Sequence, residues 1–356
     1  MVLTTQTSGE AVLASVEKAR ALGAVAAEWR VDTWARPEEA LALLTRSALP
    51  VLFTCRPEAA GGMYKGSEPD RLALLEKALT AGAAWVDWDF ALGLPPAMLP
   101  EDRRVVSLHL STPLANQPRD THAEFFATPA AVLKIVPTAH HSGHLTALRD
   151  LLKDQGRPLA CFAMGSGGLA SRVLALAWGS HWVFAPLAGE TPTASGQIPL
   201  EELANVYHVT EVTADTPLFG VVGNPVAHSR SPPLHNTWFR ENGLHAVYVP
   251  FFVQNLQVEI RALEALGVRG LSVAVPHKQA ALEVAAHADS ATRAVRACNT
   301  LLRDGERWRG MNTDGPGVRE AILKTLYDGP RPERPFAGQE VVVVGAGGAA
   351  SAAAYA

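Results

Sequence analysis

Side chains able to bind a small polar molecule follow a short apolar run in the second half of the chain. Residues 219–236 read F-G-V-V-G-N-P-V-A-H-S-R-S-P-P-L-H-N, with Ser229 and Ser231 two positions apart. In an extended stretch, residues at this spacing face the same side. Two hydroxyls on one face, followed by a helix start at Pro232 and Pro233, suit the binding of a carboxylate or polyol.

Further polar residues come directly after short apolar runs. Lys278 ends V-P-H-K, Asn299 lies within C-N-T, and Asp314 lies within N-T-D-G. A Lys, an Asn and an Asp at the ends of successive strands would form a site suited to a polar substrate. The second half therefore predicts a binding site for a small molecule.

Short β-like runs alternate with helical stretches through roughly the first 205 residues. We expect strands near residues 1–5, 24–30, 51–55, 85–90, 105–109, 131–136, 159–163 and 182–185. Residues 9–22, 71–81, 142–155 and 169–179 are apolar at helical spacing. This α/β alternation predicts a (β/α)8 TIM barrel with its site at the C-terminal ends of the strands.

A second series of elements begins after the polar stretch 210–216, which is typical of a linker. Strands are expected near residues 218–222, 245–251, 270–275 and 299–302, and residues 328–338, with three prolines, form a second expected linker. We therefore predict a barrel domain at 1–208, an α/β substrate-binding domain at 217–327 and the beginning of a nucleotide-binding domain at 338–356.

The expected nucleotide-binding segment carries a glycine-rich motif. Residues 340–350 read E-V-V-V-V-G-A-G-G-A-A, which predicts a buried parallel strand that opens into a helix, as in the Rossmann fingerprint. Such a loop allows the pyrophosphate of a dinucleotide to approach the helix N-terminus closely. The residues expected to bind the cofactor are Gly345, Gly347, Gly348 and Ala350.

Bulk composition excludes several classes of protein. A chain of 356 residues with 48% hydrophobic and 19% charged residues suggests two or three globular domains. A net charge of −4 gives no basis for binding nucleic acid, and no apolar stretch is long enough for a membrane span. Cys55, Cys161 and Cys298 are too few and too widely separated for a disulfide framework or a metal site. We expect a cytoplasmic protein with small-molecule partners and no metal; its oligomeric state stays open.

The second half resembles shikimate dehydrogenase from Phe219 to Ala356. The motifs that carry this resemblance are G-N-P-V-A-H-S-R-S-P-P-L-H-N, G-L-S-V-A-V-P-H-K, A-C-N-T-L, G-M-N-T-D-G-P-G and V-V-G-A-G-G-A-A. The resemblance implies that Lys278 and Asp314 flank the hydroxyl that becomes a ketone while hydride moves to NADP. It also implies that the substrate is bound by Ser229, Ser231 and Asn299.

The first half resembles type I 3-dehydroquinate dehydratase, a (β/α)8 barrel, up to about Tyr207. Its motifs are E-W-R-V-D, T-C-R, S-L-H, V-L-K-I, A-M-G with S-R, and T-A-S-G-Q. The two halves together look like the fused dehydratase–dehydrogenase of the shikimate pathway, whose enzymes act in consecutive steps. The substrates implied are 3-dehydroquinate, 3-dehydroshikimate and shikimate.

The dehydratase resemblance implies covalent catalysis. Lys134 would form a Schiff base with the substrate ketone, and desolvation after a buried V-L run favours the neutral amine that this step needs. His109 would move protons beside the resulting iminium. The residues that match the family's binding positions are Glu28, Arg30, Arg56, Arg172, Thr193 and Gln197.

Both halves depart from their families' patterns. The dehydratase pattern T-x-R-x-x-x-E-G-G has a histidine-orienting glutamate where this chain has Ala60, and Asp89 stands where a second glutamate is frequent. We therefore expect weak or altered dehydratase activity, unless Glu58 takes the missing role through a shifted loop. In V-A-V-P-H-K, Ala274 replaces a substrate-binding threonine, at a cost of about 0.5–1.5 kcal/mol.

The remaining strands and the ribose-binding residue of a dinucleotide fold would come after Ala356. We therefore expect little cofactor-dependent turnover from these 356 residues. Three functions remain open: a fused dehydratase–dehydrogenase, a dehydrogenase with a degenerate barrel, or a non-catalytic shikimate-binding protein.

Overall fold

The computed structural model describes residues 1–117, 119–153 and 156–356. Its contacts divide the chain into two compact units. The first comprises Met1–Thr216 with Pro233–His245, and the second comprises Pro217–Pro232 with Ala246–Ala356. Residues 338–356, expected to begin a third domain, belong to the second unit. Within the described ranges, no helix has the length and apolar character needed to cross a bilayer.

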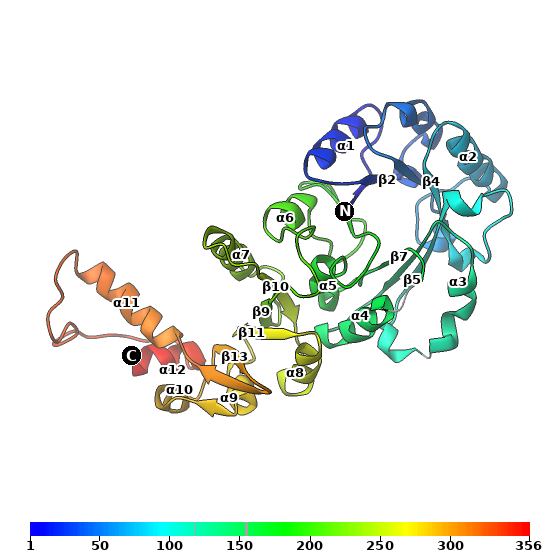
Figure 1. Ribbon diagram of the computed structural model, residues 1–356. Coiled ribbons are helices and arrows are strands. Elements are labelled where there is room, and N and C mark those ends of the chain that lie inside the picture. Colours follow the sequence, from blue (N-terminus) through cyan, green and yellow to red (C-terminus); the bar gives the residue numbers. More distant parts are fainter. Residues whose placement is uncertain (118, 154–155) are drawn as a thin grey trace. The chain divides into compact units, whose positions relative to one another are not determined.

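Eight parallel strands of the first unit curl into a barrel with helices on the outside (Figure 1). The strands are β1 (Val2–Thr5), β2 (Ala26–Arg30), β3 (Val51–Thr54), β4 (Trp85–Asp89), β5 (Arg104–Leu110), β6 (Val132–Pro137), β7 (Leu159–Cys161) and β8 (Phe184–Ala185). They follow the order β7-β6-β5-β4-β3-β2-β1-β8, so β7 and β8 are the edges of the ladder. The rings of Phe162 and Phe184, whose centroids lie 5.7 Å apart, pack these edges together.

The helices around the barrel agree with most of the predicted ones. They are α1 (Ala11–Ala21), α2 (Glu68–Thr80), α3 (Ala123–Ala127), α4 (Leu145–Lys153), α5 (Leu169–Leu174) and α6 (Leu200–Asn205). Ser67 caps α2, because its side chain accepts a hydrogen bond from the backbone N–H of Asp70. The helix expected over 169–179 ends early, since turns follow Leu174 as far as Gly179, whose φ is 103°. The predicted end of the 142–155 helix lies outside the described residues.

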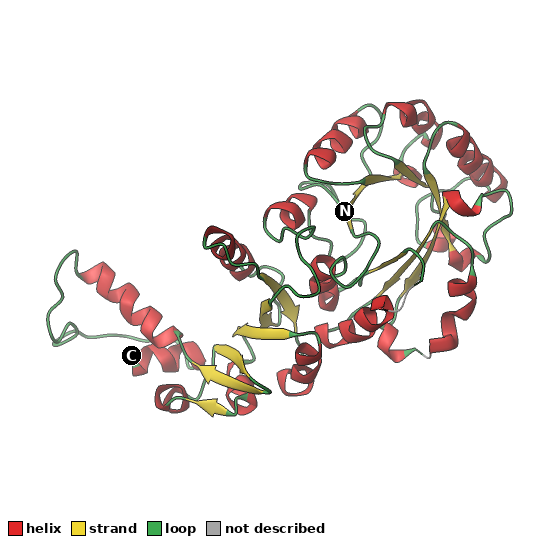
Figure 2. Ribbon diagram, viewed as in Figure 1, coloured by secondary structure: helices red, strands yellow, loops and turns green. Residues whose placement is uncertain are grey.

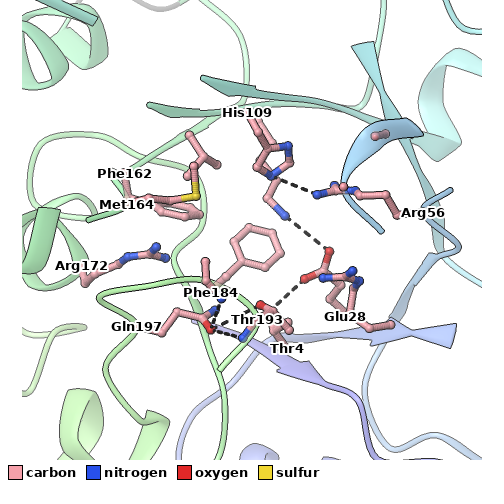
Figure 3. Close-up of a pocket in the computed structure, with 16 residues that line it drawn as sticks. Thr4, Glu28, Arg56, His109, Phe162, Met164, Arg172, Phe184, Thr193 and Gln197 are labelled. Carbon is pink, nitrogen blue, oxygen red and sulfur yellow. Dashed lines mark hydrogen bonds and ion pairs between the residues drawn. The ribbon is translucent and has the colours of Figure 1, made fainter. Parts of the chain in front are cut away.

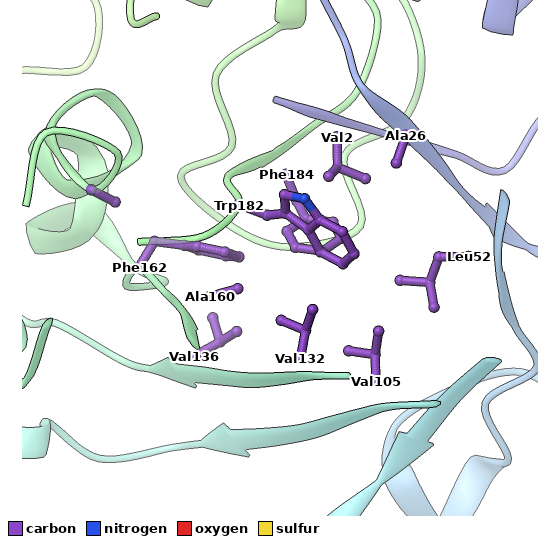
Figure 4. Packing of buried hydrophobic residues seen from close by; sticks show 11 residues of the cluster. Val2, Ala26, Leu52, Val105, Val132, Val136, Ala160, Phe162, Trp182 and Phe184 are labelled. Atoms are coloured by element: carbon purple, nitrogen blue, oxygen red, sulfur yellow. The ribbon is translucent and has the colours of Figure 1, made fainter. Parts of the chain in front are cut away.

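An apolar layer fills the end of the barrel where the strands begin. The inward side chains include Val2, Ala26, Leu52, Val105 and Val132, which pack around Trp182 and Phe184 (Figure 4). Parallel strands in such barrels are covered on both faces, which accounts for their continuous apolar runs. The apolar layer gives the barrel its stability and leaves the other ends of the strands available for polar side chains.

The second unit contains a mixed six-stranded sheet (Figure 2). Its strands are β9 (Leu218–Gly223), β10 (Val247–Phe252), β11 (Val268–Val273), β12 (His287–Ala288), β13 (Thr300–Asp304) and β14 (Arg307–Met311), in the order β10-β9-β11-β13-β14-β12. The first three pair in parallel, whereas β13 runs antiparallel to β11 and β14. The helices are α7 (Ser231–Glu241), which spans the division between the units, α8 (Leu256–Ala265), α9 (Lys278–Val284), α10 (Ser290–Val295), α11 (Asp314–Leu326) and α12 (Gly348–Tyr355).

Two strands escaped the sequence prediction. β12 has two residues, and β14 reads R-W-R-G-M, which lacks an apolar run. Its period of two is nonetheless clear, because Trp308 and Gly310 are buried while Arg307 and Arg309 are exposed.

The strand predicted over residues 340–345 is absent, and this prediction was wrong. Val342 and Val344 are 86% and 94% exposed, and the segment pairs with no strand within the described ranges. A strand depends on the ladder hydrogen bonds and the covering layers of its neighbours, so an apolar run without them does not become one. Only the helix start is formed, with Gly347 at the N-cap of α12.

Candidate functional site

The interior face of the barrel changes from apolar to polar along each strand. On β5 it reads Val105, Ser107 and His109, and on β6 it passes from Val132 to Lys134. Alternate residues of a strand share a face, and inward side chains of a barrel stack in layers. The layers above the apolar core therefore bring together polar groups from strands that are far apart in the sequence.

These groups surround a cavity of about 230 Å³ (Figure 3). Every first-half residue predicted to act or to bind lies in its lining: Glu28, Arg30, Arg56, His109, Lys134, Arg172, Thr193 and Gln197. The lining also includes Ala60, where the family pattern has a glutamate, and Met164 of the A-M-G motif. The sequence did not single out Thr4, Phe162 and Phe184, which line the cavity as well.

Lys134 lies in the middle of β6 and is buried. Its Nζ lies 3.4 Å from Oε1 of Glu28 and 3.9 Å from the centroid of the Phe184 ring. A carboxylate on one side and an aromatic face on another hold the amine at a fixed place in the cavity.

Glu28 is the carboxylate near three cations of the cavity, Lys134, Arg30 and Arg56. Its two carboxylate oxygens accept hydrogen bonds from Thr4 Oγ1 at 2.9 Å and Thr54 Oγ1 at 3.1 Å. Burial alone would raise the pKa of Glu28, but the cations of Lys134, Arg30 and Arg56 outweigh it and lower the pKa to about 2. The carboxylate is therefore charged at neutral pH.

His109 lies between a carboxylate and a guanidinium. Its Nδ1 lies 3.2 Å from Asp89 Oδ2, and its Nε2 lies 3.3 Å from Arg56 Nη1. Because a guanidinium only donates, Nε2 accepts from Arg56, and the ring proton is on Nδ1 and donated to Asp89. Burial, and then the charge of Arg56, lower the pKa of His109 to about 4, against the opposing effect of Asp89. The imidazole is thus a neutral base at physiological pH.

The pKa of His109 gives a direct prediction. The lowered pKa means that protonation is delayed to acid pH, so the imidazole stays neutral down to about pH 4, with Arg56, Asp89 and Lys134 as the charged groups around it. The Cε1–H resonance of His109, assigned with a His109→Asn variant, should titrate with a midpoint near 4. A midpoint near the ordinary value of about 6.5 would contradict the buried, cation-facing position.

Arg56 is held by two aspartates from β4. Its Nη2 donates to Asp87 Oδ2 at 2.9 Å and to Ser107 Oγ at 3.2 Å, and its Nε lies 3.6 Å from Asp89 Oδ2. Burial acts to lower the pKa of Arg56, but Asp87 and Asp89 raise it above its ordinary value. The D-W-D alternation that ends β4 was the sequence signal for this pair, since both aspartates share one face.

Arg30 is fixed by a carboxylate in the same way. Its Nε and Nη2 donate to the two oxygens of Asp32 at 2.9 and 2.8 Å. This paired geometry leaves Arg30 charged and rigid at the edge of the cavity.

Among the described residues, no carboxylate pairs with Arg172 in this way. Arg172 lies in α5 with 2% of its surface exposed, and its guanidinium carbon lies 4.5 Å from the centroid of the Phe162 ring. Its Nε and Nη2 have no hydrogen-bond partner in the part of the chain that the structure describes. Burial lowers the pKa of Arg172 to about 9. A buried cation with two unused donors that lines a cavity is suited to bind an anion.

Gln197 closes the segment beside the cavity into a tight loop. Its Oε1 accepts from the backbone N–H groups of Thr193 and Ala194, at 2.7 and 3.2 Å, and from Thr193 Oγ1 at 3.3 Å. Gln197 and Thr193, both predicted as binding residues, are thus joined by hydrogen bonds within one loop.

The second unit joins three of its predicted site residues by hydrogen bonds. Lys278 Nζ donates to Asp314 Oδ2 at 2.5 Å, and Asn299 Nδ2 donates to Asp314 Oδ1 at 2.7 Å and to Thr313 Oγ1 at 2.9 Å. The lysine is at the start of α9 and the aspartate at the start of α11. The carboxylate at the start of α11 thus joins the amine at the start of α9 and the amide of Asn299, which directly precedes β13.

Ser229 and Ser231 form a separate pair, and the geometry expected for them was wrong. The segment is a turn, in which the backbone N–H of Ser231 donates to Ser229 Oγ at 3.2 Å and Ser231 begins α7. Serine hydroxyls readily bind the backbone two residues on, and this favours a turn over an extended chain.

One of the predicted cofactor-binding glycines, Gly348, packs closely against other residues of the second unit. A Cβ added to Gly348 would lie 2.7 Å from Ala297 Cβ and 3.5 Å from Lys278 Cβ. Glycine at this position therefore lets the start of α12 approach the residue that begins α9. Ala350 lies within α12, and Gly345 and Gly347 lie in the segment before it.

Two family models match the chain. One described as type I 3-dehydroquinase matches residues 1–214, and one described as shikimate dehydrogenase substrate binding domain matches residues 221–301.

Curated relatives match one or both halves. The chain is 32% identical over 362 residues to a bifunctional 3-dehydroquinate dehydratase/shikimate dehydrogenase of Arabidopsis thaliana, covering 95% of this chain and 59% of that one. It is 44% identical over 147 residues to a shikimate dehydrogenase (NADP(+)) of Anaeromyxobacter dehalogenans, covering 41% of this chain and 50% of that one. The chain therefore spans about half to three fifths of these relatives.

Two solved structures are each similar to a part of the chain. A 3-dehydroquinate dehydratase from Geobacillus kaustophilus aligns over 59% of this chain and 90% of that one, with 25% identity and a TM-score of 0.49. A shikimate dehydrogenase from Aquifex aeolicus aligns over 40% of this chain and 52% of that one, with 33% identity and a TM-score of 0.36.

Proposed function

Because the chain belongs to the type I 3-dehydroquinase family, we propose that its barrel dehydrates 3-dehydroquinate to 3-dehydroshikimate through a lysine Schiff base. The observation that carries this proposal is the convergence on one cavity of Lys134, neutral His109 and Arg172, whose Nε and Nη2 bond to none of the described residues. These supply a nucleophile, a base and a cation for the substrate carboxylate.

The chemistry follows from the positions of these groups. The Lys134 side chain, once its ammonium has lost a proton, adds to the ketone as the neutral amine and water leaves, which gives an iminium that acidifies the neighbouring C–H. The Nε2 lone pair of His109 takes that proton, after the substrate displaces the Arg56 N–H that occupies it. The imidazolium then protonates the departing hydroxyl, and hydrolysis of the iminium frees Lys134 and the enone product. One water is lost in the net reaction.

Direct assay tests this proposal. The conjugated product absorbs in the ultraviolet and the substrate does not, so incubation with 3-dehydroquinate should give a steady rise in absorbance. Absence of any rise at micromolar enzyme, for a chain with a cooperative melting transition, would contradict it and favour the degenerate barrel as the alternative.

For the second unit we propose a site for shikimate and 3-dehydroshikimate. The hydrogen-bonded group of Lys278, Asn299 and Asp314 supports this, because an amine held by a carboxylate can exchange a proton with a substrate hydroxyl. The carboxylate of the substrate would bind at Ser229 and Ser231.

NADP is the proposed cofactor of this second activity, supported by relatives named as NADP(+) enzymes. The cofactor would supply or accept hydride. The described residues fit it only in part: the start of α12 is formed, but the apolar segment before it is unpaired and exposed. We therefore assign to these residues substrate binding and proton transfer at Lys278 and no hydride step. A cytoplasmic location without nucleic-acid or membrane partners is also proposed, supported by the net charge of −4 and three free cysteines.

Calorimetry with shikimate tests the second site without requiring turnover. The chain is expected to bind shikimate without NADP, and Ser229→Ala should weaken binding by about tenfold, because a hydrogen bond to a charged group contributes about 1.5–3 kcal/mol. Thr325→Ala, at an exposed position of α11, is the matched control and should leave the affinity unchanged. No heat with the unmodified chain, or equal affinities for all three proteins, would contradict this assignment.

A further inference from the structure

A catalytic histidine requires a partner that holds its ring and selects its tautomer, and the position where the dehydratase pattern supplies one carries Ala60 in this chain. The structure has a different carboxylate on the ring, since Asp89 Oδ2 lies 3.2 Å from His109 Nδ1. We propose that Asp89 is the positioning residue of His109, so that the carboxylate comes from β4 instead of the loop after β3. This inference rests on the proposed dehydratase function.

The strand register explains why Asp89 reaches the ring. In the parallel pair of β4 and β5, Asp87 is opposite Val105 and Asp89 is opposite Ser107. Asp87 accepts from Ser107 Oγ at 3.2 Å, and Asp89 contacts His109. Each aspartate thus contacts the residue two positions beyond its own partner, on the same face of β5. The contact is set by the register of the sheet.

The carboxylate of Asp89 is itself fixed. It is buried, and its Oδ1 accepts the backbone N–H of Ala91 at 3.0 Å, which leaves Oδ2 for His109 and for Arg56, whose Nε lies 3.6 Å away. Burial would raise the pKa of Asp89, but the contacts with His109, Arg56 and Ala91 lower it overall, so the group stays an acceptor. An anchored anion holds the ring proton on Nδ1 and keeps the Nε2 lone pair toward the cavity.

The other carboxylate near Ala60 does not take this role. Glu58 lies on a short turn that ends at Ala60, with 64% of its side chain exposed, and its Oε1 lies 4.0 Å from Lys65 Nζ. It is absent from the cavity lining, whereas Ala60 and Gly61 are part of it. The idea that a shifted loop brings Glu58 to His109 is therefore wrong.

Paired amide substitutions separate the two carboxylates. Asp89→Asn removes the anion while keeping the side-chain shape, and it should lower kcat for 3-dehydroquinate about 10- to 10²-fold with KM changed less than about threefold. Glu58→Gln is the matched control and should stay within about twofold of the parent. Asp89→Glu keeps the charge and should retain at least about a tenth of the parent kcat.

The tautomer of His109 separates a positioning role of Asp89 from a merely structural one, because a structural role would not affect which ring nitrogen carries the proton. In the parent and in Asp89→Glu, ¹⁵N spectra at pH 7 should show the proton on Nδ1, whereas Asp89→Asn should shift it toward Nε2. A parent-like kcat and tautomer in Asp89→Asn, or an equal loss in Glu58→Gln, would overturn the assignment.

The same experiment distinguishes this inference from the proposed function. Borohydride trapping of substrate on Lys134 should persist in Asp89→Asn, because the two residues serve different steps. If the parent neither traps nor turns over substrate, the dehydratase proposal fails, while the tautomer measurement still decides the role of Asp89.

Discussion

Replacement of Lys134 by alanine is expected to lower kcat for 3-dehydroquinate by at least about 10⁴-fold, as loss of a covalent nucleophile removes the intermediate that makes the chemistry fast. The amine is buried between Glu28 and Phe184, and among the described residues that line the cavity no other is a lysine. The measurement is initial velocity by product absorbance, together with borohydride reduction during turnover. In the parent, the peptide that contains Lys134 should gain the mass of one bound ligand less one water plus two hydrogens, as expected for a reduced imine, and Lys134→Ala should show no adduct.

The control for this prediction is Lys77→Ala, at an exposed position of α2. It should keep both the adduct and the rate of the parent. An adduct on another lysine, or parent-like velocity in Lys134→Ala, would refute the Schiff-base assignment.

Replacement of Arg172 by methionine is expected to raise KM for 3-dehydroquinate by about 10²-fold or more and to raise the melting temperature. The binding effect follows because two donors of the guanidinium have no partner among the residues that the structure describes, and hydrogen bonds to a carboxylate contribute about 1.5–3 kcal/mol each. The stability effect follows because the charge of Arg172 is removed from water, which lowers its pKa to about 9 and destabilises the folded state. The contact with the Phe162 ring offsets only part of that cost. One substitution should therefore stabilise the folded protein while it weakens substrate binding.

Steady-state kinetics and calorimetric melting of the two proteins check both parts of this prediction. Arg36→Met, at an exposed position, is the matched control and should change neither KM nor the melting temperature. A lower melting temperature in Arg172→Met would mean that the guanidinium is a structural group, and an unchanged KM would mean that the substrate carboxylate binds elsewhere.

The sequence alone predicted the barrel and the polar residues that line its cavity. Alternation of β-like and helical runs predicted the barrel, because the periods of two and 3.6 are local properties of the chain. All eight first-half residues chosen from motifs line one cavity. This agreement arises because the strand ends of a parallel barrel meet on one face, so that position along a strand already indicates position in space.

Tertiary contacts decided the rest. From the sequence, Ala60 in place of a glutamate indicates that His109 lacks its carboxylate partner. Only the register of β4 against β5 reveals that Asp89 contacts His109 instead. The serine pair became a turn, because the Ser229 hydroxyl binds the backbone of Ser231. The valines of residues 341–344 did not form a strand, because a strand needs ladder partners that the described residues do not provide. Residue types and local periods are carried by the chain itself, whereas partners across strands depend on register and burial, and these exist only after the elements have packed.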